Sequence, residues 1–200
     1  MTILVLGLVF TGAVLVSALG VAVSIRIADR VGAHDYPDSE RKRQERPIPR
    51  LGGIAVAIAF ACVSLIGLGI AGQTRTVALA MTILLPALLI AIVGFVDDMR
   101  HVHPGIRLSL QAGVALLAWT LGTRISVTEI WWVDLLLFIL WILTIVNGIN
   151  LLDNSDGLAA STVLVAAVGA TAIALSSGQE LVAVLGVSLG GVAVGFLWFN

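Results

Sequence analysis

Long apolar stretches alternate with short polar connections along the whole chain. These stretches reach the roughly 17–25 residues that a helix needs to cross a bilayer. They fall at residues 3–25, 51–71, 77–96, 106–122, 130–150, 159–177 and 181–198. The strict polar–apolar alternation of a membrane barrel is absent from the sequence. The pattern predicts an all-α, polytopic transmembrane bundle of about seven spans, forming one integral-membrane domain over residues 1–200.

Composition supports this prediction and excludes other classes. Hydrophobic residues make up 59% of the chain, charged residues 12%, and the mean hydropathy is +1.08. A soluble domain of this size does not need so much apolar surface. The net charge of −1 gives no sign of nucleic-acid binding.

The basic residues are distributed unevenly between the connections. Nine of the eleven lie in the connections after the first and third apolar stretches, and only Arg75 and Arg124 lie in the opposite ones. The positive-inside rule makes the richer side cytoplasmic and predicts an N-terminus outside. Nine of the twelve acids gather on the same side, although that rule does not concern acids. Their clustering predicts a shared cytoplasmic site.

The first polar segment on that side ends in the sequence Pro-Ile-Pro-Arg-Leu-Gly-Gly, residues 47–53. Two prolines restrict the backbone, Arg50 lies at the membrane interface, and two glycines allow a phosphate or another backbone to approach closely. This favours anion binding. The alternative is a topology signal followed by a stiff entry into the second span.

The second segment contains the adjacent acids Asp97 and Asp98 at the end of the third span. Two carboxylates there face the negative end of the helix macrodipole and repel each other. A bound divalent cation would relieve both penalties, and Mg²⁺ commonly uses one or two carboxylates plus substrate phosphates. The alternative is a solvated loop start. Arg107 and Gln111 follow, four residues apart on one face of the next helix.

The third segment crowds six polar residues into ten positions between two apolar spans. If the fifth span stays helical, its three asparagines share one stripe at positions i, i+3 and i+7. An alternative explanation is that Asp156 or Ser155 only caps the next helix. Capping explains one acid, whereas the segment contains Asn147, Asn150, Asp153, Asn154, Ser155 and Asp156.

Taken together, the three segments resemble the polyprenyl-phosphate N-acetylhexosamine-1-phosphate transferase superfamily, multi-pass enzymes that start bacterial cell-envelope glycans. The resemblance rests on the Pro-Arg-Leu-Gly-Gly loop, the Asp-Asp pair and the Asn-x-x-Asn-x-x-Asp-x-x-Asp-Gly-Leu-Ala block, in that order. The sequence of the loop is similar to that of the branch that initiates teichoic acid and O-antigen. The resemblance implies a protein of the bacterial cytoplasmic membrane whose active site faces the cytoplasm.

The resemblance implies transfer of N-acetylhexosamine-1-phosphate from a UDP-N-acetylhexosamine to undecaprenyl (polyprenyl) phosphate, with release of UMP. The implied cofactor is Mg²⁺, or Mn²⁺ in its place. Asp97 is expected to assist deprotonation of the lipid phosphate, and Asp98 to orient it or bind metal. Asn150 and Asp153 are expected in the metal–diphosphate region. The implied catalytic acids are Asp97, Asp98, Asp153 and Asp156, and the implied metal ligands are Asp98, Asn150 and Asp153.

The implied substrate-binding residues come from all three segments. They are Arg41, Lys42, Arg50, Arg107, Asn150, Asn154 and Ser155. Asn154, Ser155 and Asp156 match the turn that lines the uracil pocket in the family. Arg107 stands where the family usually has Lys, which keeps the charge but changes the geometry.

The largest departure is at the end of the chain. Family members continue after a Phe-Asn like Phe199-Asn200 into a metal-binding Gly-Asp loop and a His-rich loop. The sequence is therefore expected to be either part of a longer protein or a truncated, non-catalytic homologue that binds lipid phosphate or a partner. A membrane transporter is the less favoured alternative, because transporters place polar residues near the bilayer midplane.

Glycines in the last span give two interleaved small-xxx-small spacings, at Gly186, Gly190, Gly191 and Gly195. Such faces suit packing within one chain as well as a dimer seam. The sequence therefore does not decide between packing within the chain and a homodimer.

Overall fold

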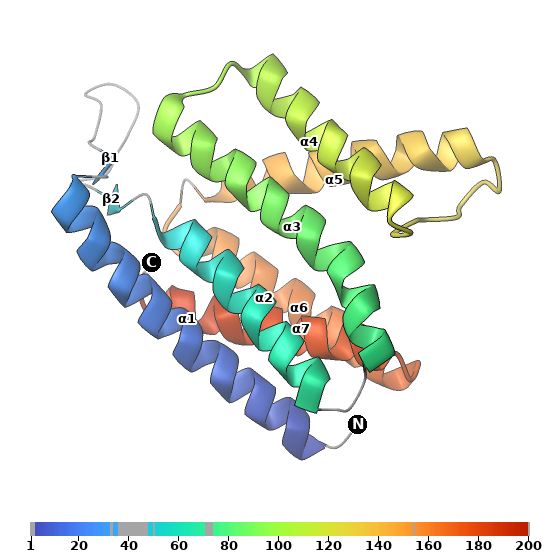
Figure 1. Ribbon diagram of the computed structural model, residues 1–200, viewed down its shortest axis with the longest axis horizontal. Helices are drawn as coiled ribbons and strands as arrows, with labels where there is room; N and C mark the ends of the chain where they lie inside the picture. The colour runs from blue at the N-terminus through green and yellow to red at the C-terminus, as the bar shows by residue number, and fades with distance from the viewer. Residues whose placement is uncertain are drawn as a thin grey trace.

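A computed structural model describes residues 3–32, 34–35, 48–49, 51–70, 74–153 and 155–199. Helices dominate these ranges, and the only strands in them, β1 (His34–Asp35) and β2 (Ile48–Pro49), pair antiparallel. The all-α polytopic class is confirmed. The helices are α1 (Ile3–Val31), α2 (Gly52–Ile70), α3 (Thr74–Arg100), α4 (Pro104–Thr120), α5 (Trp131–Leu152), α6 (Leu158–Ser176) and α7 (Glu180–Leu197), as Figure 1 shows.

Each predicted span corresponds to a helix. Within the described residues, six of these helices reach 18 residues and are long and apolar enough to cross a membrane. The seventh, α4, has 17 residues, the same length as the span predicted over 106–122. It runs back alongside α3 and returns the chain to the other end of the bundle (Figure 1).

Two helices extend beyond their predicted ends. α1 continues to Val31 rather than residue 25, and α3 continues to Arg100 rather than residue 96. Each has a basic residue in its last turn, where a positive charge interacts favourably with the helix dipole. Asp97 and Asp98 therefore lie on the final turns of α3 and not in a loop.

The last helix is the centre of the first packing unit. α7 has buried residues along most of its length and packs against α1, α2 and α6. A Cβ on Gly191 would lie 2.6 Å from the carbonyl oxygen of Phe10, so α1 and α7 approach closely at this point. The Ser17 hydroxyl also donates a hydrogen bond to the Val192 carbonyl at 2.9 Å.

The glycine spacings of α7 are used within the chain. Gly191 and Gly195 face α1, whereas Gly186 and Gly190 face α6. These contacts account for both faces by intramolecular packing, so the glycines no longer favour a dimer seam. The homodimer stays a prediction.

A second packing unit comprises α4 and α5, joined to the rest through α3. Its core consists of Ala115, Ala118 and Phe138, and the rings of Trp119 and Phe138 have centroids 5.7 Å apart. α5 packs mainly against α4 and only lightly against α6. The polar end of α5 is therefore placed chiefly by its contact with α4.

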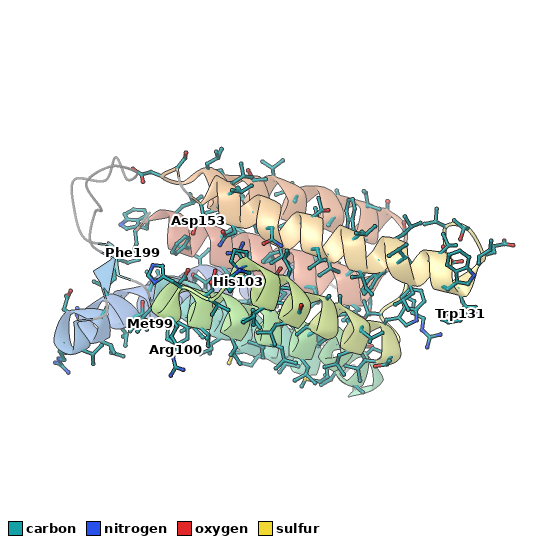
Figure 2. The ribbon with its side chains drawn as sticks, turned by 90° about the horizontal axis from the view of Figure 1, so that it is seen from above. Met99, Arg100, His103, Trp131, Asp153 and Phe199 are labelled. Atoms are coloured by element: carbon teal, nitrogen blue, oxygen red, sulfur yellow. The ribbon has the colours of Figure 1, made fainter. Side chains whose placement is uncertain are left out.

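The chain direction brings the polar segments to one end of the bundle. α1, α3, α5 and α7 finish on the side where α2, α4 and α6 begin (Figure 1). Figure 2 shows Met99, Arg100, His103 and Asp153 toward this end and Trp131 toward the other. The second and third polar segments therefore lie at one end of the bundle, as the predicted shared site requires.

Candidate functional site

The turn between α3 and α4 is held by the carboxylate of Asp97. Its Oδ2 lies 2.7 Å from Nη1 of Arg107, and its Oδ1 accepts a hydrogen bond from the backbone N–H of Val102 at 3.1 Å. The His101 N–H donates to the Asp97 carbonyl at 2.8 Å, with His101 at φ +48°. Asp97 thus joins the end of α3 to the start of α4, using both carboxylate oxygens.

The start of α4 is fixed by a histidine cap. Nδ1 of His103 accepts a hydrogen bond from the Gly105 N–H at 3.2 Å, and Pro104 occupies the first helical position. His103 is therefore a capping residue of the turn. In the part of the chain that the structure describes, no cluster of three or more His, Cys, Asp or Glu side chains forms a preassembled metal site.

Arg107 retains one hydrogen-bonding group that no described residue satisfies. Its Nη1 binds Asp97, whereas its Nε is buried and has no partner among the described residues. Asp98 is exposed on the same final turns of α3. This region therefore offers an anion a guanidinium donor next to a carboxylate.

The turn between α5 and α6 depends on a glycine. α5 ends at Leu152, Asp153 is its C-cap, and Gly157 opens α6 at φ +69°, a conformation that disfavours other residues. No side chain of Ser155 or Asp156 bonds the first turn of α6 within the described ranges. The capping explanation for these two residues is therefore not supported by the structure.

Asn150 and Asp153 present oxygen atoms at the end of α5. Both residues are solvent-exposed, and neither side chain makes a hydrogen bond with a described residue. Partial burial of the carboxyl group nevertheless raises the pKa of Asp153. A carboxylate oxygen and an amide oxygen from residues three apart are suitable ligands for Mg²⁺, which commonly completes its coordination with substrate phosphates and water.

A second polar contact joins α4 to α5 one helical turn below the surface residues. Nδ2 of Asn147 donates to Oε1 of Gln111 at 2.8 Å and to the Leu143 carbonyl at 2.8 Å. Gln111 is 4% exposed. The sequence marks Gln111 as the lone amide of its apolar stretch and Asn147 as the first of three asparagines, but it does not pair them.

The first segment can be placed only in part. Arg41, Lys42 and Arg50 lie outside the described residues, as does Asn154 of the third segment. Gly52 lies beside the Phe196 ring of α7, whereas a Cβ on Gly53 would meet no described atom within 4 Å. The antiparallel pairing of β1 and β2 keeps the two ends of this segment together.

Two of the cavities among the described residues flank α4. One, of about 210 Å³, lies between α3 and α4 with apolar walls and Arg107 at its edge. The other, of about 260 Å³, lies at the opposite end between α4 and α5, near Arg124 and Trp131. Asp98, Asn150, Asp153 and Asp156 line neither cavity.

The structure therefore assembles the predicted residues in two groups at one end. Asp97 and Arg107 are in direct contact, and Asp98 lies beside them. Asn150, Asp153, Ser155 and Asp156 form a separate exposed group at the α5–α6 turn. α4 carries Arg107 of the first group, and its Gln111 bonds Asn147 of α5, three residues before Asn150 of the second group.

Comparison with known proteins gives a consistent result. The profile of the family described as "Glycosyl transferase family 4" matches residues 80–200, which include both groups. The chain is similar to a probable undecaprenyl-phosphate N-acetylglucosaminyl 1-phosphate transferase of Bacillus subtilis (strain 168). The two are 32% identical over 184 residues, covering 88% of this chain and 50% of the relative.

Phospho-N-acetylmuramoyl-pentapeptide-transferases are also similar. The protein of Shouchella clausii (strain KSM-K16) is 31% identical over 185 residues, covering 82% of this chain and 55% of the relative. The protein of Heliobacterium modesticaldum (strain ATCC 51547 / Ice1) is 31% identical over 173 residues, covering 76% and 52%. The chain spans about half the length of the curated relatives it matches.

Proposed function

The chain belongs to glycosyl transferase family 4, and on that premise we propose that the protein transfers N-acetylhexosamine-1-phosphate from a UDP-sugar to undecaprenyl (polyprenyl) phosphate. UMP is the second product, and the reaction is the first membrane step of a cell-envelope glycan. The printed names of the relatives support this class of reaction. Because the chain spans about half of those relatives, the proposal concerns the protein as its gene encodes it.

In the proposed reaction, an oxygen of the lipid phosphate attacks the β-phosphorus of the UDP-sugar. A new P–O bond forms, and the bond from the β-phosphorus to the bridging oxygen breaks, so that UMP leaves with the electron pair. Phosphoryl transfer depends on positioning and on neutralising charge. Residues at the polar end of the bundle are suited to both tasks.

Arg107 and the acids of α3 are assigned to the lipid phosphate. The unpartnered Nε of Arg107 can donate to a phosphate oxygen while Nη1 remains bound to Asp97. Asp97 accepts the proton of a monoprotonated lipid phosphate, and Asp98 orients that phosphate or binds metal. Arg41, Lys42 and Arg50 supply further positive charge toward phosphate or nucleotide.

The α5–α6 turn is assigned to the diphosphate and the nucleotide. Asp98, Asn150 and Asp153 are the residues that would hold Mg²⁺, which would supply positive charge to the diphosphate. Asn154, Ser155 and Asp156 contact the uracil. The observation that carries the proposal is the exposed Asn150–Asp153 pair, whose side chains bond no described residue, within a sequence that matches the family.

The proposal places this end of the bundle on the cytoplasmic side of a bacterial cell membrane, with the N-terminus outside. The basic residues support this orientation, since nine of eleven lie in the connections at this end. A UDP-sugar is a cytoplasmic substrate, so the orientation and the reaction agree.

The test is release of UMP from a UDP-N-acetylhexosamine by the reconstituted protein with undecaprenyl phosphate and Mg²⁺. Asp97→Asn should abolish release, and Glu129→Gln at the opposite end should preserve it. Normal release from Asp97→Asn would exclude the role assigned to that residue. Nucleotide binding without any release from the unaltered protein would instead favour a non-catalytic homologue.

A further inference from the structure

Gln111 and Asn147 form an amide–amide hydrogen bond between two helices inside the apolar part of the chain. Gln111 lies on α4 and Asn147 on α5, with Nδ2 to Oε1 at 2.8 Å and Gln111 4% exposed. Both residues lie in otherwise apolar helices, and the apolar core between α4 and α5 includes Ala115, one turn after Gln111. A buried amide next to a partly buried one is costly in such surroundings unless the two pair or serve a function.

The bond fixes the plane of the Asn147 amide. One N–H bond goes to the Leu143 carbonyl of the same helix and the other to Gln111. Since an amide nitrogen has two donors, both are used, and the Oδ1 atom must point away from both acceptors. Gln111 thereby determines the rotamer of Asn147 and, with it, the rotation of this part of α5 relative to α4.

Gln111 shares its face of α4 with Arg107, one turn earlier. Arg107 binds Asp97 of α3 and Gln111 binds Asn147 of α5, so α4 links the two groups of site residues. Asn150 follows Asn147 by three residues on the same face of α5. A shift at Asn147 is therefore transmitted directly to Asn150 and to Asp153.

We propose that Gln111 is a positioning residue, which acts through Asn147 to hold the end of α5 in place relative to the Asp97–Arg107 pair. The structural part stands on the contacts between the helices. Its consequence for catalysis rests on the proposed transfer reaction, because Asn150 and Asp153 are assigned there to the diphosphate.

The experiment uses the protein as its gene encodes it, in lipid nanodiscs. Gln111→Met keeps the side-chain length and removes the acceptor, and Gln111→Glu keeps an acceptor oxygen. Ser109→Ala is the matched control, since among the described residues that exposed hydroxyl of α4 bonds the Gly105 carbonyl of its own helix and no other helix. Hydrogen–deuterium exchange of residues 147–153 is measured, together with kcat and KM for each substrate.

Gln111→Met should exchange about threefold faster over residues 147–153, as expected for loss of one interhelical hydrogen bond. Exchange in α7 and in the Ser109→Ala control should not change. For UMP release, kcat/KM for the UDP-sugar should fall about tenfold or more, as expected when a residue that orients metal-binding side chains is lost. KM for the lipid should stay constant, and Gln111→Glu should restore most of the loss.

Asn147→Leu should reproduce the effects of Gln111→Met, and the double variant should be no worse than either. Unchanged exchange over residues 147–153, or additive losses in the double variant, would overturn the link between the helices. A lower Tm with normal kcat and KM values would reduce Gln111 to a structural residue and overturn the positioning role. If the unaltered protein released no UMP, the proposed function would fail, whereas the exchange data would still decide the link.

Discussion

Nη1 of Arg107 lies 2.7 Å from Oδ2 of Asp97, across the turn between α3 and α4. The side chains are 27% and 15% exposed, so the pair is largely but not fully removed from solvent. The other Asp97 oxygen binds the Val102 N–H. Asp97, which is proposed to act in catalysis, therefore also holds two helices together.

This pair predicts a stability effect that is separable from catalysis. Arg107→Met should lower the free energy of unfolding by about 1–3 kcal/mol, because Asp97 then remains partly buried without its charged partner. Unfolding in detergent, followed by circular dichroism, measures this loss. The control is Arg100→Met, an exposed residue on the same end of α3, and equal stability of both variants would contradict the prediction.

The close contact of α1 with α7 predicts a strong effect of one methyl group. A Cβ on Gly195 would lie 2.5 Å from the Val14 carbonyl oxygen, so Gly195→Ala should destabilise the protein by about 1–3 kcal/mol. Gly169→Ala on α6 is the control, because a Cβ there meets no described atom within 4 Å. Helix propensity makes that change neutral or stabilising by up to about 1 kcal/mol. A thermal shift of the same size in both variants would argue against the contact.

Asp153 predicts a pH-dependent stability. Partial burial raises its pKa in the folded protein above the ordinary value of 3.8, so the folded state favours the protonated form. The resulting stability is present below pH 3.8 and is lost as the pH rises through the higher pKa of the folded state. In EDTA, Asp153→Asn should match the unaltered protein at low pH and become the more stable of the two above this window. Asp156→Asn, measured in parallel, controls for loss of a nearby carboxylate; a stability difference that grows toward acid pH would contradict the expectation.

The proposed metal site predicts dependence of UMP release on a divalent cation. EDTA should abolish release and excess Mg²⁺ should restore it. Asp153→Asn should raise the Mg²⁺ concentration needed for half-maximal rate by about tenfold or more, since one carboxylate ligand is lost. Glu180→Gln, at the start of α7, should leave that concentration unchanged. Full activity in EDTA would remove the cation from the mechanism.

The proposed orientation predicts which turns a membrane-impermeant thiol reagent can reach in intact cells. In a Cys62→Ser background, Ser126→Cys between α4 and α5 should be labelled from outside. Ser155→Cys at the α5–α6 turn should react only after permeabilisation. The opposite pattern would invert the topology, since the two positions lie at opposite ends of the bundle (Figure 1).

The lengths of the apolar stretches were sufficient to predict most helices, because an apolar stretch of spanning length leaves the backbone no other way to satisfy its hydrogen bonds in a bilayer. These lengths predicted the ends of the helices less accurately. Charged residues can continue a helix into the interface, so α1 and α3 run further than hydropathy indicated, to Val31 and Arg100. α4, from Pro104 to Thr120, has the predicted length but begins and ends two residues earlier than the stretch 106–122, because Pro104 occupies its first position.

The sequence by itself determined the helical membrane class, the family and the end of the bundle at which the polar segments meet. Those properties follow from composition, from the order of motifs and from helices that run alternately in opposite directions. Only the tertiary structure decided which side chains touch. It paired Asp97 with Arg107 and Gln111 with Asn147, and it left Asn150 and Asp153 exposed. Such pairings depend on the rotation and depth of neighbouring helices, which side-chain packing sets and which hydropathy does not encode.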